Sequence, residues 1–148
     1  MTRKRFIWVD EDERIWAPER WLLEGLGVEV VAISDATSAF RLLRDARPDE
    51  VNLIILDVML LPGDDDVIFS DVETEGGIKT GLVLGKLLAR QHVSIGNKLL
   101  FFSRVTDGPG TAEIIRVSKD IGAYYLQKSR KTQGLHFIKW LREKGFVE

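Results

Sequence analysis

The 148-residue chain contains no cysteine, which excludes a disulfide scaffold and any metal site built from thiolates. Its 21 basic and 23 acidic residues leave a net charge of only −2, which argues against a nucleic-acid binder that relies on a general positive field. No stretch approaches the roughly 20 consecutive apolar residues of a membrane span, and the first apolar run is too short for a signal peptide. These absences predict a cytoplasmic protein that contacts neither membrane nor nucleic acid directly.

The length and composition fit one globular domain. With 45% hydrophobic residues, a chain of this length can bury a core of ordinary size. Neither an internal repeat nor a linker divides it, so we expect a single domain over residues 1–148. Because the chain ends at Glu148, shortly after its last predicted helix, we also expect that no output domain is attached.

Short apolar runs alternate with segments of helical period along the chain. The runs predicted to be strands are RFIWVD (5–10), VEVVAI (28–33), NLIILDV (52–58), KLLFFS (98–103) and AYYLQK (123–128). The segments predicted to be helices cover residues 17–27, 35–48, 78–91, 111–122 and 132–145. Strict alternation of this kind predicts an α/β fold with a five-stranded parallel sheet and helices on both of its faces.

Several residues are expected at particular places in these helices. Pro18 fits the first turn of the first helix, and Thr111 is a candidate N-cap for the fourth. The buried face of the last helix should contain Leu135, Ile138 and either Leu141 or the stem of Arg142.

The segment 63–77 breaks this periodicity and carries six acidic residues with no lysine or arginine among them. A calcium site of the helix–loop–helix type would need an acid at its fifth loop position and a glycine at its sixth. Counted from Asp64, these positions hold Ile68 and Phe69, so calcium is disfavoured. We interpret the segment as a solvated acidic loop inserted into the domain.

Polar residues end four of the five apolar runs. Asp10 and Glu11 follow the first run, Asp57 lies near the end of the third, Ser103 ends the fourth and Lys128 ends the fifth. The carboxyl ends of parallel strands meet at one edge of a sheet, where ligands bind. Each residue alone could be a solvated strand end or a helix cap, but their coincidence favours a common site at that edge.

The chemistry of these side chains is consistent with phosphoryl transfer. Carboxylates held together raise one another's pKa, and a divalent cation relieves that repulsion. Mg²⁺ fits best, because it takes hard oxygen ligands and needs only one or two carboxylates beside a phosphate. Asp57 could then stay ionised as a nucleophile toward phosphorus. Lys128 would neutralise charge on the transferring group, and Ser103 would donate a hydrogen bond to it.

In this order and on these strands, the residues resemble the receiver domain of two-component response regulators (the CheY-like superfamily). The residues that carry the resemblance are Asp10, Glu11, Asp57, Ser103, Tyr125 and Lys128. The stretch IGAYYLQKS is similar to the family's usual Gly-Ala-x-x-Tyr-Leu-x-Lys-Pro, which places the family's switch aromatic at Tyr125. The resemblance covers nearly the whole chain apart from 63–77. It implies a doubly wound, flavodoxin-like (βα)5 sheet with strand order 2-1-3-4-5.

The resemblance also implies a reaction and its partners. Asp57 would accept a phosphoryl group from a histidine kinase or a histidine phosphotransfer protein. Mg²⁺ would be held by Glu11 and Asp57, by Asp10 through a water molecule, and by the backbone carbonyl of Met59. The family's chemistry is limited to self-phosphorylation and autodephosphorylation, so the protein would be a signalling phosphoprotein and not an enzyme.

A conformational switch is implied as well. Ser103 would move toward the phosphoryl group, and Tyr125 would turn inward behind it. This movement would reshape a face made of the fourth helix (111–122), the fifth strand (123–128) and the fifth helix (132–145), to which an unknown downstream protein would bind.

The chain departs from the family at several positions. Ser129 stands where the family has proline after the lysine, and Arg104 stands where the residue after the hydroxyl is usually small. A guanidinium at Arg104 could narrow access for the phosphodonor or pair with Asp57. Met59 and Val105 are the other candidate modulators of the phosphoryl chemistry. The loop after the third strand is longer than usual by on the order of fifteen residues.

These departures leave two other functions open. One is an atypical receiver that acts as a phosphorylation-independent protein-interaction module. The other is a haloacid-dehalogenase-like phosphohydrolase, which also forms an aspartyl phosphate. That class needs an acidic residue two positions after the nucleophile as general acid, and Met59 cannot transfer a proton. The phosphohydrolase is therefore disfavoured.

Overall fold

A computed structural model describes residues 3–104 and 108–148 of the chain. The strands are β1 (Arg5–Val9), β2 (Glu29–Ile33), β3 (Leu53–Leu56), β4 (Leu99–Ser103) and β5 (Tyr124–Gln127). All neighbouring strands pair in parallel, and the sheet has the order β2-β1-β3-β4-β5. The predicted flavodoxin-like α/β architecture and its strand order are confirmed.

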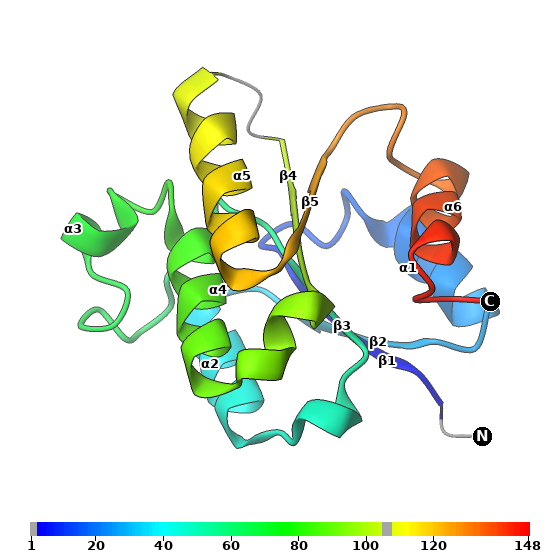
Figure 1. Ribbon diagram of the computed structural model, residues 1–148, viewed down its shortest axis with the longest axis horizontal. Helices are drawn as coiled ribbons and strands as arrows, with labels where there is room; N and C mark the ends of the chain where they lie inside the picture. Colours follow the sequence, from blue (N-terminus) through cyan, green and yellow to red (C-terminus); the bar gives the residue numbers. More distant parts are fainter. Residues whose placement is uncertain (1–2, 105–107) are drawn as a thin grey trace.

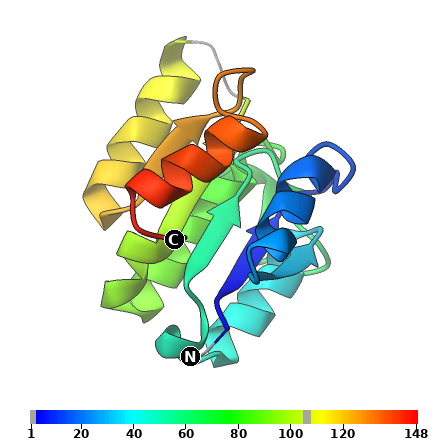
Figure 2. The same ribbon diagram turned by 90° about the vertical axis from the view of Figure 1, so that its right-hand side faces the viewer.

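Helices cover both faces of this sheet. They are α1 (Ala17–Gly25), α2 (Ala36–Asp45), α3 (Asp71–Thr74), α4 (Thr80–Gln91), α5 (Gly108–Ile121) and α6 (Leu135–Glu143), with 3-10 turns η1 (Pro48–Glu50) and η2 (Val93–Lys98). Helices α1 and α6 lie on one face, and α2, α4 and α5 lie on the other (Figures 1 and 2). None of the helices in the described ranges is long and apolar enough to cross a membrane.

The central strands are buried between two apolar layers. All four residues of β3 are buried, as the continuous apolar run predicts for a strand covered on both faces. Under α1 and α6, the rings of Trp8 and Trp16 stack with centroids 4.2 Å apart, and Phe102 stacks on Phe137 at 4.8 Å. Stacked aromatic pairs of this kind add to the stabilisation from buried area. The sheet is therefore a firm support for the residues at its carboxyl edge.

Two expectations about helix ends and faces are wrong. Pro18 does lie in the first turn of α1, as predicted. Thr111 does not cap its helix, because α5 begins at Gly108 and Thr111 falls inside it. Leu135 is the first residue of α6 and is 72% exposed. Phe137 is buried in the core in place of Leu135. A start of α6 at 135, three residues later than predicted, explains why this first leucine lies outside the packed face.

The acidic segment 63–77 is more ordered than the predicted loop. It contains the single turn α3, whose first residue follows the cap Ser70, and the Ser70 hydroxyl accepts the backbone N–H of Glu73 (3.2 Å). Phe69 is buried, and its ring meets that of Phe40 edge to face with centroids 6.4 Å apart. The buried ring of Phe69 thus attaches the segment to α2, and the capped turn gives it order of its own.

Candidate functional site

Polar side chains follow four strands at the carboxyl edge of the sheet. Asp10 comes directly after β1, Asp57 directly after β3 and Lys128 directly after β5, while Ser103 is the last residue of β4. Backbone hydrogen bonds continue the sheet beyond the strands: Asp57 N–H donates to the Val9 carbonyl (3.0 Å) and Lys128 N–H to the Ser103 carbonyl (2.8 Å). The sheet therefore fixes the relative positions of the four residues.

The Lys128 ammonium lies between two carboxylates. Its Nζ atom is 2.7 Å from Asp10 Oδ2 and 3.4 Å from Asp57 Oδ2. The side chains of Lys128 and Asp10 are both almost fully buried, and the ring of Phe102 lies 5.5 Å from the ammonium. A buried charge is costly unless it is paired. Lys128 thus compensates both acids and lies nearer to Asp10.

Asp57 is held at both of its carboxylate oxygens. The Ser103 hydroxyl donates to Oδ1 at 3.0 Å, the backbone N–H of Met59 donates to the same atom at 3.3 Å, and Lys128 faces Oδ2. The Asp57 side chain is 17% exposed. It is therefore the member of the group that is both fixed in orientation and open to solvent.

Burial is the main influence on the pKa of Asp57. Loss of hydration raises the pKa of this carboxyl above its ordinary value of 3.8. The Lys128 cation opposes that rise, the neighbouring Asp10 charge adds to it, and the hydrogen bonds from Ser103 and Met59 oppose it. On balance the pKa of Asp57 is raised, so a proton would compete with a metal cation for this carboxylate.

The predicted metal ligands are brought together only in part. Asp10 and Asp57 share Lys128, but Glu11 is exposed and takes part in no ion pair or hydrogen bond of the described side chains. Across residues 3–104 and 108–148, no three acidic or histidine side chains are grouped as a metal site. Asp10, directly after β1, is turned inward to Lys128, whereas Glu11 lies in the bend that follows and is exposed to solvent. The role of Met59 as a carbonyl ligand, like Mg²⁺ itself, stays a prediction.

The expected modulators lie at the rim of the site. Arg104 is exposed and pairs with neither Asp57 nor any other described acid at ion-pair distance; its charge contributes slightly to the lowered pKa of Asp12. Met59 is half exposed. Val105 lies outside the described residues.

The two tyrosines of β5 face opposite sides of the sheet. Tyr125 packs against the layer formed with α4 and α5, and burial raises the pKa of its hydroxyl while a hydrogen bond with Thr111 opposes the rise. Tyr124 packs on the other side against Trp140 and Phe146. The alternation of side chains along a strand accounts for the opposite orientations, and both tyrosines are half-buried.

A hydroxyl network after Lys128 was not predicted from the sequence. The Thr132 hydroxyl accepts the backbone N–H of Ser129 (2.8 Å) and donates to the carbonyl of Gln127 (2.6 Å). Ser129 Oγ in turn accepts the N–H of Lys131 (3.2 Å). These bonds close a tight loop directly after Lys128, where the family has proline. The Ser-x-x-Thr spacing is the signal that could have revealed it.

Two further contacts fix helices of the domain, one between α1 and the start of α6 and one between α4 and the end of β3. The buried Glu19 of α1 accepts the backbone N–H of Gly134 (2.8 Å), just before α6. Gly81 in the first turn of α4 presses against the strand end, because a Cβ there would overlap the carbonyl oxygen of Asp57. Its own N–H donates to the Val58 carbonyl (2.8 Å). No sequence pattern reveals such a close approach between two backbones.

Comparison with known proteins places this geometry in a familiar fold. No protein-family model matches the chain, and no curated protein matches it. A receiver domain protein (CheY-like) from Methanospirillum hungatei superposes with a TM-score of 0.68 at 19% identity, over 97% of this chain and 94% of that one. The HemR receiver domain of Leptospira biflexa gives 0.67 at 18% identity, over 96% and 94%. Chemotaxis protein CheY4 of Vibrio cholerae gives 0.65 at 20% identity, over 96% and 98%.

Identities near 20% establish the fold alone, and here that fold extends over nearly the full length of each compared chain. The strand order and the polar residues at the carboxyl edge agree with it. The chain therefore has the fold of the CheY-like receiver domains of two-component response regulators.

Proposed function

We propose that the protein is a phosphoacceptor in two-component or phosphorelay signalling, with Asp57 as the residue that is phosphorylated. The observation that carries this proposal is the pair of contacts at the Asp57 carboxylate, with the Ser103 hydroxyl on one oxygen and the Lys128 ammonium on the other. A hydroxyl and a cation beside a partly exposed carboxylate are the groups that an incoming phosphoryl group requires.

The reaction would be a transfer of one phosphoryl group. An Asp57 oxygen attacks phosphorus, its O–P bond forms, and the bond from phosphorus to a donor histidine nitrogen breaks, so the histidine leaves and takes up a proton. Lys128 offsets the negative charge on the phosphoryl oxygens, and Ser103 donates a hydrogen bond to one of them. The buried Asp10 pairs with Lys128 and holds its ammonium in place. On this account the protein accepts and loses a phosphoryl group and turns over no other substrate.

Mg²⁺ is the cofactor that the donor set fits. Two carboxylates at one edge, Asp10 and Asp57, are the number that Mg²⁺ commonly uses, with waters and phosphate oxygens completing its octahedron. Glu11 and the carbonyl of Met59 would complete the protein ligands. When bound, the ion would neutralise charge on the phosphoryl oxygens and on Asp57. It would also oppose the protonation that burial favours at Asp57.

The output would be a change at the face formed by α5, β5 and α6. Ser103 ends β4, and Tyr125 lies on the neighbouring strand β5 and hydrogen-bonds with Thr111 of α5. A shift of Ser103 toward a phosphoryl group would open space behind it for Tyr125 and release that contact with α5. The phosphoryl donor would be a histidine kinase or a histidine phosphotransfer protein. A downstream partner protein would bind this face.

Intact mass after incubation with acetyl phosphate and Mg²⁺ tests the proposal. The wild type should gain the mass of one phosphoryl group, and Asp57→Ala should gain nothing. If neither acetyl phosphate nor a histidine kinase produces an adduct, the protein is instead a phosphorylation-independent interaction module. The ordered acidic segment and the Lys128–Asp10 pair, which already exists without a phosphoryl group, are the features that would favour that second function.

A further inference from the structure

The acidic segment 63–77 is attached firmly to the domain and yet exposes two apolar side chains. Besides Phe69, the buried Thr74 donates to the Ser70 carbonyl (2.8 Å) and accepts the N–H of Gly77 (3.1 Å). Val67 and Val72, on either side of Phe69, are 84% and 86% exposed. Both valines line the same groove, and exposed apolar side chains that gather at one place are typical of contact surfaces.

A groove lies between this segment and α4. It has a volume of about 610 Å³ and is lined on the segment side by Val67, Ile68 and Val72. On the α4 side its apolar lining continues through Leu82, Val83 and Leu87. The rest of its lining is charged, namely Glu73, Glu75, Lys79, Lys86, Arg90 and Glu113. Aliphatic side chains bordered by charged ones form the kind of surface that receives an amphipathic helix.

The rim on the segment side carries uncompensated negative charge. Asp66, Asp71 and Glu73 are exposed, and none of them forms an ion pair with a described residue. Their neighbours differ: Asp64 pairs with Arg41 (3.3 Å) and Glu75 with Lys79 (2.9 Å). Of the unpaired acids Glu73 lines the groove itself, while Asp66 and Asp71 are exposed neighbours in sequence of the lining residues Val67 and Val72.

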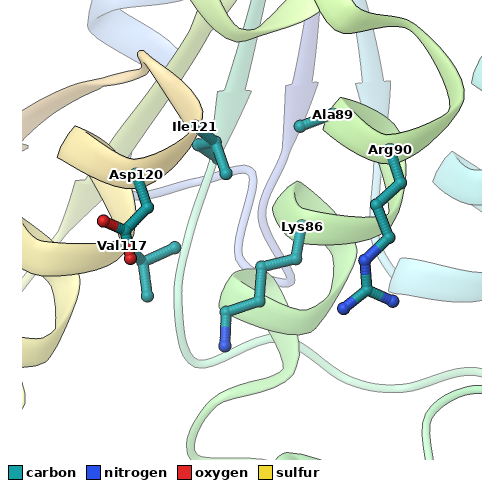
Figure 3. Close-up of a pocket in the computed structure, with 6 residues that line it drawn as sticks. All are labelled: Lys86, Ala89, Arg90, Val117, Asp120 and Ile121. Carbon is teal, nitrogen blue, oxygen red and sulfur yellow. The ribbon is translucent and has the colours of Figure 1, made fainter.

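The opposite rim is basic. Lys86 and Arg90 project from α4 in Figure 3 and line both this groove and the neighbouring hollow of about 440 Å³ between α4 and α5. Neither forms an ion pair with a described residue, and Asp120 lies across that hollow on α5. A partner with basic residues on both edges would meet repulsion here. The charges therefore select a partner whose basic edge faces the acidic segment.

We propose that this groove binds an amphipathic helix of a partner protein, with its apolar stripe on Val67, Val72 and the α4 aliphatic residues. Lysine or arginine residues of that helix would lie along the edge that faces Asp66, Asp71 and Glu73. The site goes beyond the proposed phosphoacceptor function and is independent of it. Among the described residues that line the groove, Glu113 of α5 is the one that belongs to the elements of the switched face.

The test uses a synthetic helical peptide with leucines at i, i+3, i+4 and i+7 spacing and lysines along one edge. A matched peptide carries glutamates at the lysine positions. Both are titrated into ¹⁵N-labelled full-length protein and into its Asp57→Ala variant, while amide shifts are recorded and the affinity is measured by calorimetry. The lysine peptide should shift amides of the segment and of α4 in both proteins, and its binding should weaken with added salt.

Three variants locate the contacts. Val67→Ser with Val72→Ser should weaken the lysine peptide about tenfold through lost apolar area. Asp66→Asn, Asp71→Asn and Glu73→Gln together should also weaken it about tenfold. Lys86→Gln with Arg90→Gln is the matched control on the other rim and should leave it unchanged or slightly tighter. Circular dichroism of each variant should match the wild type, because all seven side chains lie at the surface or at its edge.

Several results would overturn the proposal. They are shifts that map outside the segment and α4, equal binding of the glutamate peptide, the absence of binding, or insensitivity to the valine and acid variants. Self-association seen by sedimentation, relieved by the two serine substitutions, would show that a second copy of the chain occupies the groove instead.

Discussion

The ammonium of Lys128 lies 2.7 Å from the carboxylate of Asp10, and both side chains are almost fully buried. The same ammonium is 3.4 Å from Asp57, which is partly exposed. The shorter of the two ion pairs of Lys128 thus joins two residues that would not themselves carry the phosphoryl group. Asp10 acts in this arrangement as the support of Lys128, and Lys128 is what presents positive charge to Asp57.

Removal of Asp10 should therefore cost stability. Asp10→Ala leaves the Lys128 ammonium buried with one weaker partner, so we expect the free energy of unfolding to fall by about 3 kcal/mol. Glu11→Ala is the control, because Glu11 is exposed and unpaired among the described residues; it should change stability by less than about 0.5 kcal/mol. Urea denaturation measures both. Equal losses for the two variants would contradict the assigned geometry.

Replacement of Lys128 should slow the phosphorylation of Asp57 more than it disturbs the fold of the remaining site. Lys128→Met keeps the side-chain length and removes the charge, and the rate of adduct formation from acetyl phosphate should drop by about 100-fold. Lys131→Met, three residues along the same loop and exposed, should leave the rate within about twofold. A rate for Lys128→Met close to that of the control would show that the ammonium does not assist the transfer.

The pKa of Asp57 gives a prediction with a definite sign. Burial raises this pKa above 3.8, Lys128 lowers it and Asp10 raises it. Carbon-13 titration of the carboxyl should place the wild-type pKa above that value, Lys128→Met should move it higher, and Asp10→Asn should move it lower. Any reversal of these two directions would refute the assignment of the neighbours.

The same shift has a consequence for stability. A carboxyl with a raised pKa in the folded state binds its proton more tightly when folded, so its ionisation disfavours the fold. This penalty is full above the folded pKa and disappears as the pH falls below the unfolded value near 3.8. The wild type should accordingly lose stability relative to Asp57→Asn as the pH rises through the folded pKa, which melting curves across the acid range would measure.

Gly81 should tolerate no side chain. A Cβ at this position would overlap the carbonyl oxygen of Asp57, so Gly81→Ala must displace the first turn of α4 or the strand end. We expect a loss of about 2 kcal/mol in the free energy of unfolding and slower phosphorylation. Gly25→Ala is the control, because open space surrounds Gly25 at the end of α1 and alanine should be neutral or slightly stabilising there.

Thr132 should position Lys128 through its hydroxyl. Thr132→Val removes the acceptor of the Ser129 N–H and the donor to the Gln127 carbonyl, so stability should fall by about 1–2 kcal/mol and adduct formation should slow. Thr132→Ser keeps the hydroxyl and should restore both. The serine variant tests the hydroxyl itself: if it behaves like the valine variant, then the methyl packing and not the hydrogen bonds holds this loop.

The sequence predicted the sheet and the residues at its edge because polar side chains interrupt otherwise continuous apolar runs. Asp57, Ser103 and Lys128 could be found in this way, since the carboxyl ends of parallel strands must meet. The close approach of Gly81 to Asp57 and the bond from Gly134 to Glu19 depend on tertiary packing, which no local pattern encodes. The burial of Phe69 was missed because the segment around it is rich in acids and has no regular apolar period.

The misplaced helix ends have a related cause. Thr111 is a good N-cap residue, yet α5 begins at Gly108, so local cap preference did not decide where the helix starts. Asp10 and Glu11 appeared equivalent in the sequence, but the strand end turns one inward to Lys128 and the other to solvent. Distinctions of this kind require the neighbouring strands to be in place.

The central claim is that Asp57 accepts the phosphoryl group, and chemical trapping tests it most directly. The protein is incubated with acetyl phosphate and Mg²⁺, treated with sodium borohydride, which reduces an acyl phosphate to an alcohol, and digested for peptide mass mapping. The account predicts homoserine at position 57 and nowhere else, with no trapped product in Asp57→Ala. A trapped product at another carboxylate would contradict it. So would the absence of any trapped product with every phosphodonor tried, a histidine kinase among them.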